Sequence, residues 1–359
     1  MSKPSTAERA PTPSLAALAT AIPSHHLAQD DIADHARRVF GLRDVAFDRL
    51  AGVYRNAQIE QRHASAPLEW FLENRSFPER NALFLQSATA LLTEAAEKAL
   101  AEAGLAAGDI DTIVTVCSSG IATPSLEARV MGALPFRADV QRLPIFGLGC
   151  AGGVMGMARA AAMAMAEPSS RVLLLVVELC SLTFRLGDRS KSNLVATALF
   201  GDGAAAAVIT CRPEVADTAP RLGPWGEHTW PGSLDVMGWD MAEDGMKVVF
   251  SRDIPTLVKE DLRPVVDTFL ARHGLTLGQI DDFVCHPGGA KVVDALEDCF
   301  DLDRGALADA RQTLRDHGNM SAATVLFVLR LALDAGDGGR RLMTTLGPGF
   351  TAAMMVIDA

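Results

Sequence analysis

The sequence predicts an α/β protein made of two similar halves, and three observations lead to that fold class. Helical segments alternate with short apolar strands along most of the chain, which is typical of layered α/β proteins. At 359 residues, the chain exceeds the usual size of a single hydrophobic core. The same succession of a helix, a glycine and a strand occurs once in each half, which indicates an internal structural repeat.

The repeat can be followed segment by segment. Apolar residues at helical spacing predict a long helix, a glycine is expected to end it, and a short apolar segment predicts a buried strand. These segments are 81–103, Gly104 and 111–117 in the first half, and 254–273, Gly274 and 281–286 in the second. Further helices are expected at 151–167 and 291–299. Both halves supply candidate site residues, so we expect them to share one core.

Composition shifts predict where the halves begin and end. Residues 1–14 are rich in Pro, Ser and Thr and lack the apolar core of a signal peptide, so we expect a disordered tail. The periodicity is interrupted at 211–220. We therefore expect an N-terminal half at 15–215 and a C-terminal half at 216–359.

The composition argues against several classes of function. A net charge of −11 argues against nucleic acid or an anionic membrane surface as the main partner. The most apolar run, 172–177, is far shorter than the roughly 20 residues that cross a bilayer, so no membrane span is expected. The six cysteines contain no C-x-x-C pair and no zinc spacing, so we expect no metal site and reduced thiols in a cytoplasmic protein.

Cys150 is the candidate nucleophile. It lies in the glycine-rich turn 147–153, between the apolar segment 143–148 and a helix of small residues. The start of a helix is the positive end of its dipole, which lowers the pKa of a thiol. A small buried cysteine without a chemical role is the alternative, and it is favoured for the other five cysteines.

A histidine and an asparagine are the candidate partners of this cysteine. His286 ends the predicted strand 281–286 and is followed by Pro-Gly-Gly, a turn that leaves the imidazole at the end of the strand. His317 is a rival, but it is expected in a loop, so His286 is preferred. Asn319 precedes an apolar helix at 322–335, where its amide either donates to a substrate or caps the helix.

Together, these residue types suit a decarboxylative Claisen condensation. A thiolate takes up an acyl group, and a neutral imidazole and a carboxamide donate hydrogen bonds to the thioester oxygen as a malonyl group loses carbon dioxide. The loop 346–351 supplies backbone donors as well, although such loops are often simple turns. The sequence therefore predicts a condensing enzyme.

Five motifs resemble those of the type III polyketide synthases, the chalcone synthase-like enzymes. They are Gly-Cys-Ala-Gly-Gly at 149–153, Ala-Leu-Phe-Gly-Asp-Gly-Ala at 198–204, His-Pro-Gly-Gly at 286–289, Gly-Asn-Met-Ser at 318–321 and Gly-Pro-Gly at 347–349. The resemblance implies the thiolase fold with a layered αβαβα core, and a homodimer. It also implies acyl-CoA and malonyl-CoA as substrates, with no bound cofactor.

The resemblance also implies a role for individual residues. Cys150 would carry the acyl group, and His286 would hold it as a thiolate in an ion pair. His286 and Asn319 would stabilise the enolate formed from malonyl-CoA. Phe200 would help to gate the CoA tunnel.

The cavity positions depart in part from those of the plant enzymes. Cys180 stands where plant enzymes have a threonine, while Thr183 is retained. Val248 falls at the second gating phenylalanine, although Val249 or Phe250 takes that place if the loop shifts, and a valine would widen the cavity. The remaining positions that the resemblance assigns to substrate binding are Ser118, Thr123 (which would reach the cavity of the partner subunit), Gly238, Ser321, Gly347, Pro348 and Gly349.

Three further segments, 181–184, 191–194 and 236–240, resemble the bacterial branch that makes alkylpyrones or alkylresorcinols from fatty acyl-CoA starters. We therefore expect a medium- or long-chain starter. Malonyl-primed tetrahydroxynaphthalene synthesis is an alternative, because Cys180 also resembles the extra cavity cysteine of those enzymes. A ketoacyl synthase III-like enzyme of fatty-acid initiation and a scaffold protein without activity are further alternatives.

The residues that bind the CoA phosphates are expected among the arginines of 43–62, where family members bind this group. Arg49 is the first choice and Arg55 the second. Arg43 and Arg62 belong to the same series, and a solvated helix face explains the series equally well.

Overall fold

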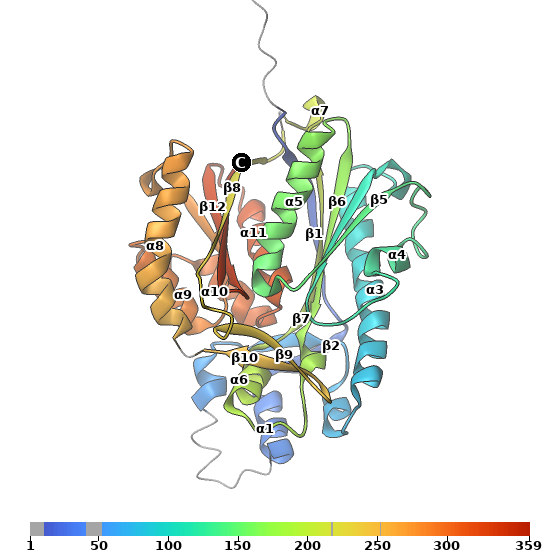
Figure 1. The fold of residues 1–359 in the computed structure, drawn as a ribbon, viewed down its shortest axis with the longest axis vertical. Helices are drawn as coiled ribbons and strands as arrows, with labels where there is room; N and C mark the ends of the chain where they lie inside the picture. Colours follow the sequence, from blue (N-terminus) through green and yellow to red (C-terminus); the bar gives the residue numbers. More distant parts are fainter. Residues whose placement is uncertain (1–10, 41–51, 217, 252) are drawn as a thin grey trace, which may run out of the picture.

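The computed structural model describes residues 11–40, 52–216, 218–251 and 253–359 (Figure 1). Its strands are β1 (Ser14–Ala21), β2 (His25–Ala28), β3 (Gln61–Ala64), β4 (Thr112–Cys117), β5 (Gln141–Phe146), β6 (Arg171–Leu179), β7 (Asp202–Thr210), β8 (Arg221–Thr229), β9 (Met237–Ala242), β10 (Gly245–Phe250), β11 (Asp282–Cys285), β12 (Arg340–Gly347) and β13 (Thr351–Asp358). Its α-helices are α1 (Gln29–Phe40), α3 (Phe77–Glu102), α4 (Leu126–Val130), α5 (Gly152–Ala166), α6 (Lys191–Leu199), α7 (Pro213–Ala216), α8 (Ile254–Arg272), α9 (Ala290–Cys299), α10 (Ala308–His317) and α11 (Thr324–Asp334). Short 3-10 helices are η1 (Leu68–Leu72), η2 (Ala107–Asp109), η3 (Gly149–Ala151), η4 (Cys180–Thr183), η5 (Leu277–Gln279) and η6 (Ser321–Ala323).

Within the described residues, nine strands form one sheet in the order β11-β12-β13-β8-β1-β7-β6-β4-β5. The first four strands of that order come from the C-terminal half of the chain, and the other five come from the N-terminal half. The two groups are joined at one register pair, Ser14 of β1 with Arg221 of β8. The sheet is therefore two half-sheets that meet where the halves of the sequence meet.

Helices cover these half-sheets in layers (Figure 1). α3 packs on one face of the N-terminal half-sheet, against β1, β6 and β7. α5 and α11 lie between the half-sheets and contact strands of both. α8 and α9 lie on the far side of the C-terminal half-sheet, where Phe269 of α8 packs against Gly226 of β8. The predicted αβαβα order of layers is confirmed.

Small residues in α5 allow this central layer to pack closely. A Cβ atom on Gly156 would lie 2.6 Å from Cγ2 of Val116 in β4, and one on Gly153 would lie 2.4 Å from the carbonyl oxygen of Ala322 in η6. Larger side chains would force the helix away from both neighbours. The run of Ala, Met and Gly therefore sets the position of the turn that precedes α5.

The predicted repeat is present in both halves. Gly104 follows α3 with φ of +65°, and Gly274 follows α8 with φ of +69°, in the left-handed conformation that ends helices. Each glycine leads through a 3-10 helix, η2 or η5, into a strand, β4 or β11. α3 starts four residues before the predicted position, because Ser76 and Glu79 form a capping box.

The predicted start of the N-terminal half, residue 15, lies one residue after the start of β1. The predicted tail is too long at its C-terminal end: Ser14 is the first residue of β1, and the carbonyl of Pro13 accepts a hydrogen bond from the backbone of Leu222. Residues 1–10 of the predicted tail lie outside the described residues. In the described part of the chain, no helix has the length and apolar character needed to cross a membrane.

Candidate active site

One cavity brings together residues from both halves of the chain. Cys150, His286 and Asn319 all line it, and it holds about 1470 Å³ of empty space, counted with its opening to solvent. Most of its other lining residues are apolar, among them Leu199, Met237, Phe250, Ile254 and Leu346. The arrangement therefore exposes three polar groups to a mainly apolar chamber.

Two glycine-containing loops hold Cys150 at the start of α5. Gly149 has φ of +48°, and a Cβ atom there would lie 2.6 Å from Cδ of Pro348. A Cβ atom on Gly347 would lie 2.6 Å from both the backbone nitrogen and the Cβ of Ala151. Thr345 donates a hydrogen bond from Oγ1 to the carbonyl of Cys150, at 2.7 Å. The loop 347–349 therefore acts as a support for the cysteine turn, and it is Leu346 that lines the cavity.

His286 follows the last residue of β11, as the strand-end argument predicts. Its backbone N–H donates to the carbonyl of Thr344, which continues the pairing of β11 with β12. The side chain is 5% exposed, yet neither ring nitrogen has a hydrogen-bond partner among the described residues. Burial lowers the pKa of His286 to about 4, so the imidazole is neutral at physiological pH. A buried ring without partners is available to a ligand.

The side-chain amide of Asn319 has a fixed orientation. Its Oδ1 accepts a hydrogen bond from the backbone of Ser321 at 2.8 Å, and its Nδ2 donates to the carbonyl of Gly288 at 3.1 Å. The backbone N–H of Asn319 donates to Leu199, at the end of α6. An amide carries two N–H donors, so one of them remains for a substrate oxygen.

The structure differs from the expected thiolate at Cys150. The pKa of this thiol is raised to about 12, mainly by burial; a hydrogen bond with Ser321 opposes the rise, and the negative charge of Glu178 adds to it. No hydrogen bond or ion pair joins Cys150 to His286 in the described structure, and the low pKa of His286 disfavours an imidazolium. Desolvation thus outweighs the helix dipole, and the site holds a neutral thiol and a neutral imidazole.

Glu178 is a site residue that the sequence argument missed. It lies in β6 with no exposed surface, its Oε2 accepts a hydrogen bond from the backbone of Ser118, and its Oε1 is unpartnered among the described residues. Burial raises the pKa of its carboxyl to about 7, although the neighbouring polar groups of Ser119, Ser118 and Ser321 oppose the change. A glutamate that directly follows the apolar run 172–177 was the signal in the sequence.

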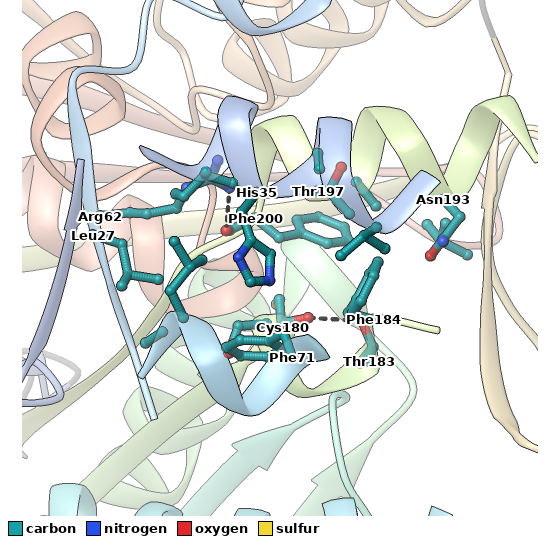
Figure 2. Close-up of a pocket in the computed structure, with 18 of the residues that line it drawn as sticks. Leu27, His35, Arg62, Phe71, Cys180, Thr183, Phe184, Asn193, Thr197 and Phe200 are labelled. Atoms are coloured by element: carbon teal, nitrogen blue, oxygen red, sulfur yellow. Dashed lines mark hydrogen bonds between the residues drawn. The ribbon is translucent and has the colours of Figure 1, made fainter. Parts of the chain in front are cut away.

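Figure 2 shows a second, mainly apolar chamber, and the contact of its Phe200 with Phe250 of the Cys150 cavity places the two spaces side by side. This second chamber holds about 710 Å³ of empty space, counted with solvent, and α1, β3, η4 and α6 surround it. Its lining residues include Ile32, Ala36, Phe40, Phe71, Cys180, Thr183, Phe184, Ala196, Phe200 and Val248. Three of the predicted cavity residues, Cys180, Thr183 and Val248, therefore line this chamber rather than the one that contains Cys150.

Phe200 forms part of the wall between the two chambers. Its ring lies 5.6 Å from that of Phe250, which lines the Cys150 cavity. Val248 packs with Cys180, Ala196 and Phe200 in one buried cluster. The aromatic ring beside Phe200 is therefore that of Phe250, one of the two alternatives to Val248 for the second gating position. With a phenylalanine there, the wall keeps the bulk that a valine would lack.

The arginines expected to bind CoA phosphates have different positions. Arg49, the first choice, lies outside the described residues, as does Arg43. Arg55 is exposed, next to Asn56 at the cavity. Arg62 is buried and donates hydrogen bonds to the carbonyl of Phe200 at 2.6 Å and to Oε1 of Gln29 at 2.5 Å, so it holds the wall and is closed to a surface phosphate (Figure 2).

The other predicted positions are distributed around the site. Ser118 accepts a hydrogen bond from the backbone of Gly149 at 3.0 Å, which ties β4 to the cysteine turn. Thr123 is exposed and lines neither chamber, and Gly238 lies in β9 beside the lining residue Met237. Ser321 adopts a positive φ of +48°, rare for a serine, which directs it toward Cys150 and Glu178. His317, the rival histidine, packs on Phe327 in a separate pocket.

A Cys, a His and an Asn around one cavity, on two repeated half-sheets with helices between them, define a condensing enzyme of the thiolase fold. Residues 2–213 match the family described as chalcone and stilbene synthases, N-terminal domain, and residues 227–359 match the corresponding C-terminal domain. The chain belongs to this family, the type III polyketide synthases, and is therefore an acyltransferase that uses CoA thioesters.

Individual relatives agree with this assignment. A protein of Bacillus subtilis (strain 168), provisionally named a chalcone synthase, is 39% identical over 356 residues, which cover 95% of this chain and 97% of that protein. The 1,3,6,8-tetrahydroxynaphthalene synthase of Streptomyces peucetius subsp. caesius is 38% identical, with coverage of 96% and 92%. The crystal structure of the Streptomyces coelicolor A3(2) tetrahydroxynaphthalene synthase, a bacterial type III polyketide synthase, superposes with a TM-score of 0.90 at 30% identity, covering 96% of this chain and 99% of that one.

Proposed function

We propose that the protein condenses malonyl-CoA repeatedly onto a medium- or long-chain fatty acyl starter and cyclises the product to an alkylpyrone or an alkylresorcinol. The observation that carries the condensation is the shared cavity of Cys150, His286 and Asn319, in which the buried imidazole has no partner. The observation that favours a fatty starter is the apolar chamber beside that cavity.

In the first step, the sulfur of Cys150 attacks the carbonyl carbon of the acyl-CoA. His286, neutral at physiological pH, accepts the thiol proton as the carbon–sulfur bond forms. The proton leaves with the CoA thiol when the old thioester bond breaks. General-base assistance is needed because the pKa of the buried thiol is about 12.

In the second step, malonyl-CoA loses carbon dioxide and becomes an enolate. The free N–H of Asn319 and one N–H of His286 donate hydrogen bonds to the enolate oxygen, which carries the developing charge. The enolate carbon attacks the Cys150 thioester and displaces the cysteine sulfur. The extended acyl-CoA then reloads the cysteine for the next round.

The starter chain has a place to extend in this proposal. Cys180 is buried and lines the second chamber. Burial raises its pKa, and a negative charge on Cys150 raises it as well, so the two thiols lie close to each other. Phe200 separates the two spaces, so a rotation of its ring would join them. Apolar side chains favour an alkyl tail there over a polar polyketide chain.

We further propose that the enzyme is a homodimer. β5 is an edge strand of the described sheet, and Phe146 at its end is 60% exposed, four residues before Cys150. An exposed edge beside an apolar surface favours association with a second copy. Thr123 is also exposed and would then face the partner subunit. Six unpaired cysteines support a reducing, cytoplasmic location.

Malonyl-primed tetrahydroxynaphthalene synthesis is the second candidate. Relatives with that name are 38% and 31% identical to this chain. A malonyl-derived chain would have no need of the apolar chamber, so the starter decides between the two. The ketoacyl synthase III alternative loses support, since both family matches are to chalcone and stilbene synthases.

A starter panel tests the proposal. Purified enzyme with malonyl-CoA should form products from decanoyl- to stearoyl-CoA, and Ala196→Phe, which fills the second chamber, should abolish long-chain products first. Ala36→Leu narrows the opposite wall if the first variant fails to fold, and Ala101→Phe on the surface of α3 is the control. Efficient turnover of malonyl starters with no use of fatty starters would refute the fatty-acyl assignment.

A labelling experiment tests the nucleophile. A thiol-directed acyl analogue should label the wild type and Cys180→Ala, and it should not label Cys150→Ala. Labelling that persists in Cys150→Ala would exclude Cys150 as the acylated residue. A protein that binds CoA thioesters without any acyl transfer would instead be a scaffold.

A further inference from the structure

We propose that His35 binds a hydroxyl group on the alkyl chain of the acyl starter, inside the second chamber. The preferred starter is then a fatty acyl thioester with a hydroxyl group in the outer part of its chain, far from the carbonyl held at Cys150. This assignment rests on the proposed function in one respect, because it requires that an acyl chain enter the second chamber past Phe200.

His35 belongs to the buried face of α1. The residues by which this helix lines the chamber are Ile32, His35, Ala36, Val39 and Phe40. They share one face because successive members are three or four residues apart, or adjacent at that spacing. His35 is the polar member of this otherwise apolar face. Its side chain is 5% exposed, and Figure 2 shows the ring directed from α1 into the chamber, toward Cys180 and Phe71.

Most polar side chains around the chamber form their hydrogen bonds within the protein. Four of them bond to neighbouring oxygens: Ser181 to Asp202, Thr183 to Cys180, Asn193 to Arg185 and Asp188, and Thr197 to Leu194. Among the described lining residues, the buried nitrogens without a partner are Nε2 of His35, Nδ1 of His63 and Nε of Arg62. An unpaired buried polar group costs free energy, so their place around one chamber favours a ligand that carries a polar group.

The state of the His35 ring selects an uncharged ligand group. Burial lowers the pKa of this imidazole, the charge of Arg38 lowers it as well, and Glu69 opposes both, so the ring is neutral at physiological pH. A neutral imidazole nitrogen donates or accepts according to its tautomer, and a hydroxyl group pairs with either form. A carboxylate would lose its water in exchange for Arg62, whose two terminal nitrogens already donate to protein oxygens.

His63 of β3 adds a second neutral imidazole to the same chamber. Burial lowers its pKa, and the nearby His26 lowers it further. Its ring packs on those of His26 and His317, with centroid distances of 5.6 and 5.8 Å. Two separate elements, α1 and β3, therefore present unpaired neutral nitrogens to a mainly apolar space, which is the composition of a site that orients a ligand through a few polar contacts.

Calorimetry with the full chain tests the assignment. Cys150→Ala serves as the background, because it cannot be acylated and so reports binding alone. The probes are stearoyl-CoA and its analogue with a hydroxyl group in the outer half of the chain. The hydroxylated chain should bind about tenfold tighter, since it gains a hydrogen bond in an apolar site. Added His35→Leu should reverse the preference, because the hydroxyl group is then buried unpaired, and added His35→Gln should restore part of it.

Two measurements separate a binding role from a structural one. His35→Leu removes an unpaired polar group from an apolar wall, so its free energy of unfolding should at least equal that of the wild type. A large loss would mean that His35 stabilises the fold, and would overturn its assignment to a ligand. His273→Leu, the same substitution at an exposed histidine that lines neither chamber, is the matched control and should keep the preference for the hydroxylated chain.

The outcomes distinguish this proposal from the proposed function. Equal affinity for the two chains would overturn the hydroxyl assignment, leave the fatty starter intact, and mean that a buried water satisfies His35. Tighter binding of a chain that ends in a carboxylate would overturn it in favour of Arg62. If neither acyl thioester bound more tightly than CoA alone, entry of a fatty chain into the chamber would itself be refuted, and the role of His35 with it.

Discussion

Replacement of the buried glutamate in β6 is a quantitative test of the electrostatics beneath the active site. Burial raises the pKa of the Glu178 carboxyl from 4.5 to about 7. The folded protein therefore binds this proton more tightly than the unfolded chain, and the free energy of unfolding falls as the pH rises from 4.5 through 7. At about 1.4 kcal/mol per pKa unit, the loss from this group reaches about 3 kcal/mol.

The variant Glu178→Gln keeps the shape of the side chain and an acceptor for the backbone of Ser118, but it does not ionise. Its free energy of unfolding relative to the wild type should therefore increase by about 2–3 kcal/mol between pH 5 and pH 8. Denaturant unfolding followed by tryptophan fluorescence at both pH values measures this difference. Glu97→Gln, at an exposed position of α3, is the control and should give the same difference at both.

A difference between Glu178→Gln and the wild type that does not change with pH would refute the reasoning. It would mean that the carboxyl titrates alike in the folded and unfolded chains. A decrease in this difference between pH 5 and pH 8 would mean that the polar groups of the surrounding serines outweigh burial.

Three further predictions concern the walls of the site. Arg62→Ala leaves the carbonyl of Phe200 without its donor and should lower the free energy of unfolding by about 2–4 kcal/mol, measured by denaturant titration; a loss below about 1 kcal/mol would contradict this role. Gly347→Ala should reduce kcat more than tenfold, since the new Cβ collides with the cysteine turn, whereas Gly278→Ala has open space and should match the wild type. Cys150 should react faster with iodoacetamide at pH 8 in Glu178→Gln than in the wild type, because the negative charge that raises the pKa of the thiol is removed. An unchanged rate would argue against an electrostatic interaction between Glu178 and Cys150.

Much of the fold could be predicted because its signals are local. The ends of α3 and α8 could be predicted because a glycine follows each helix and adopts the left-handed conformation that ends helices. The position of His286 follows from the end of an apolar strand. The turns that contain Cys150 and Asn319 could be predicted in the same way, because each contains glycine and is followed by a helical pattern.

The features that were missed depend on contacts between distant segments. Arg62 is buried because Phe200, 138 residues away, presents a carbonyl to it, and nothing in 43–62 itself indicates that partner. The pairing of Phe250 with Phe200 depends on the register of β9 and β10, which a sequence alone leaves open. The thiol pKa of Cys150 was predicted from the helix dipole, while the desolvation that dominates it comes from packing around the whole cavity.

Mass spectrometry of the enzyme during turnover tests the central claim most directly. Wild-type protein mixed with decanoyl-CoA and malonyl-CoA should carry a decanoyl group, and then its extended forms, on the peptide that contains Cys150. Asn319→Ala should carry the decanoyl group alone, because it loads the starter but stabilises the enolate poorly. Absence of any acyl group on Cys150 in the wild type, or normal extension by Asn319→Ala, would contradict the account.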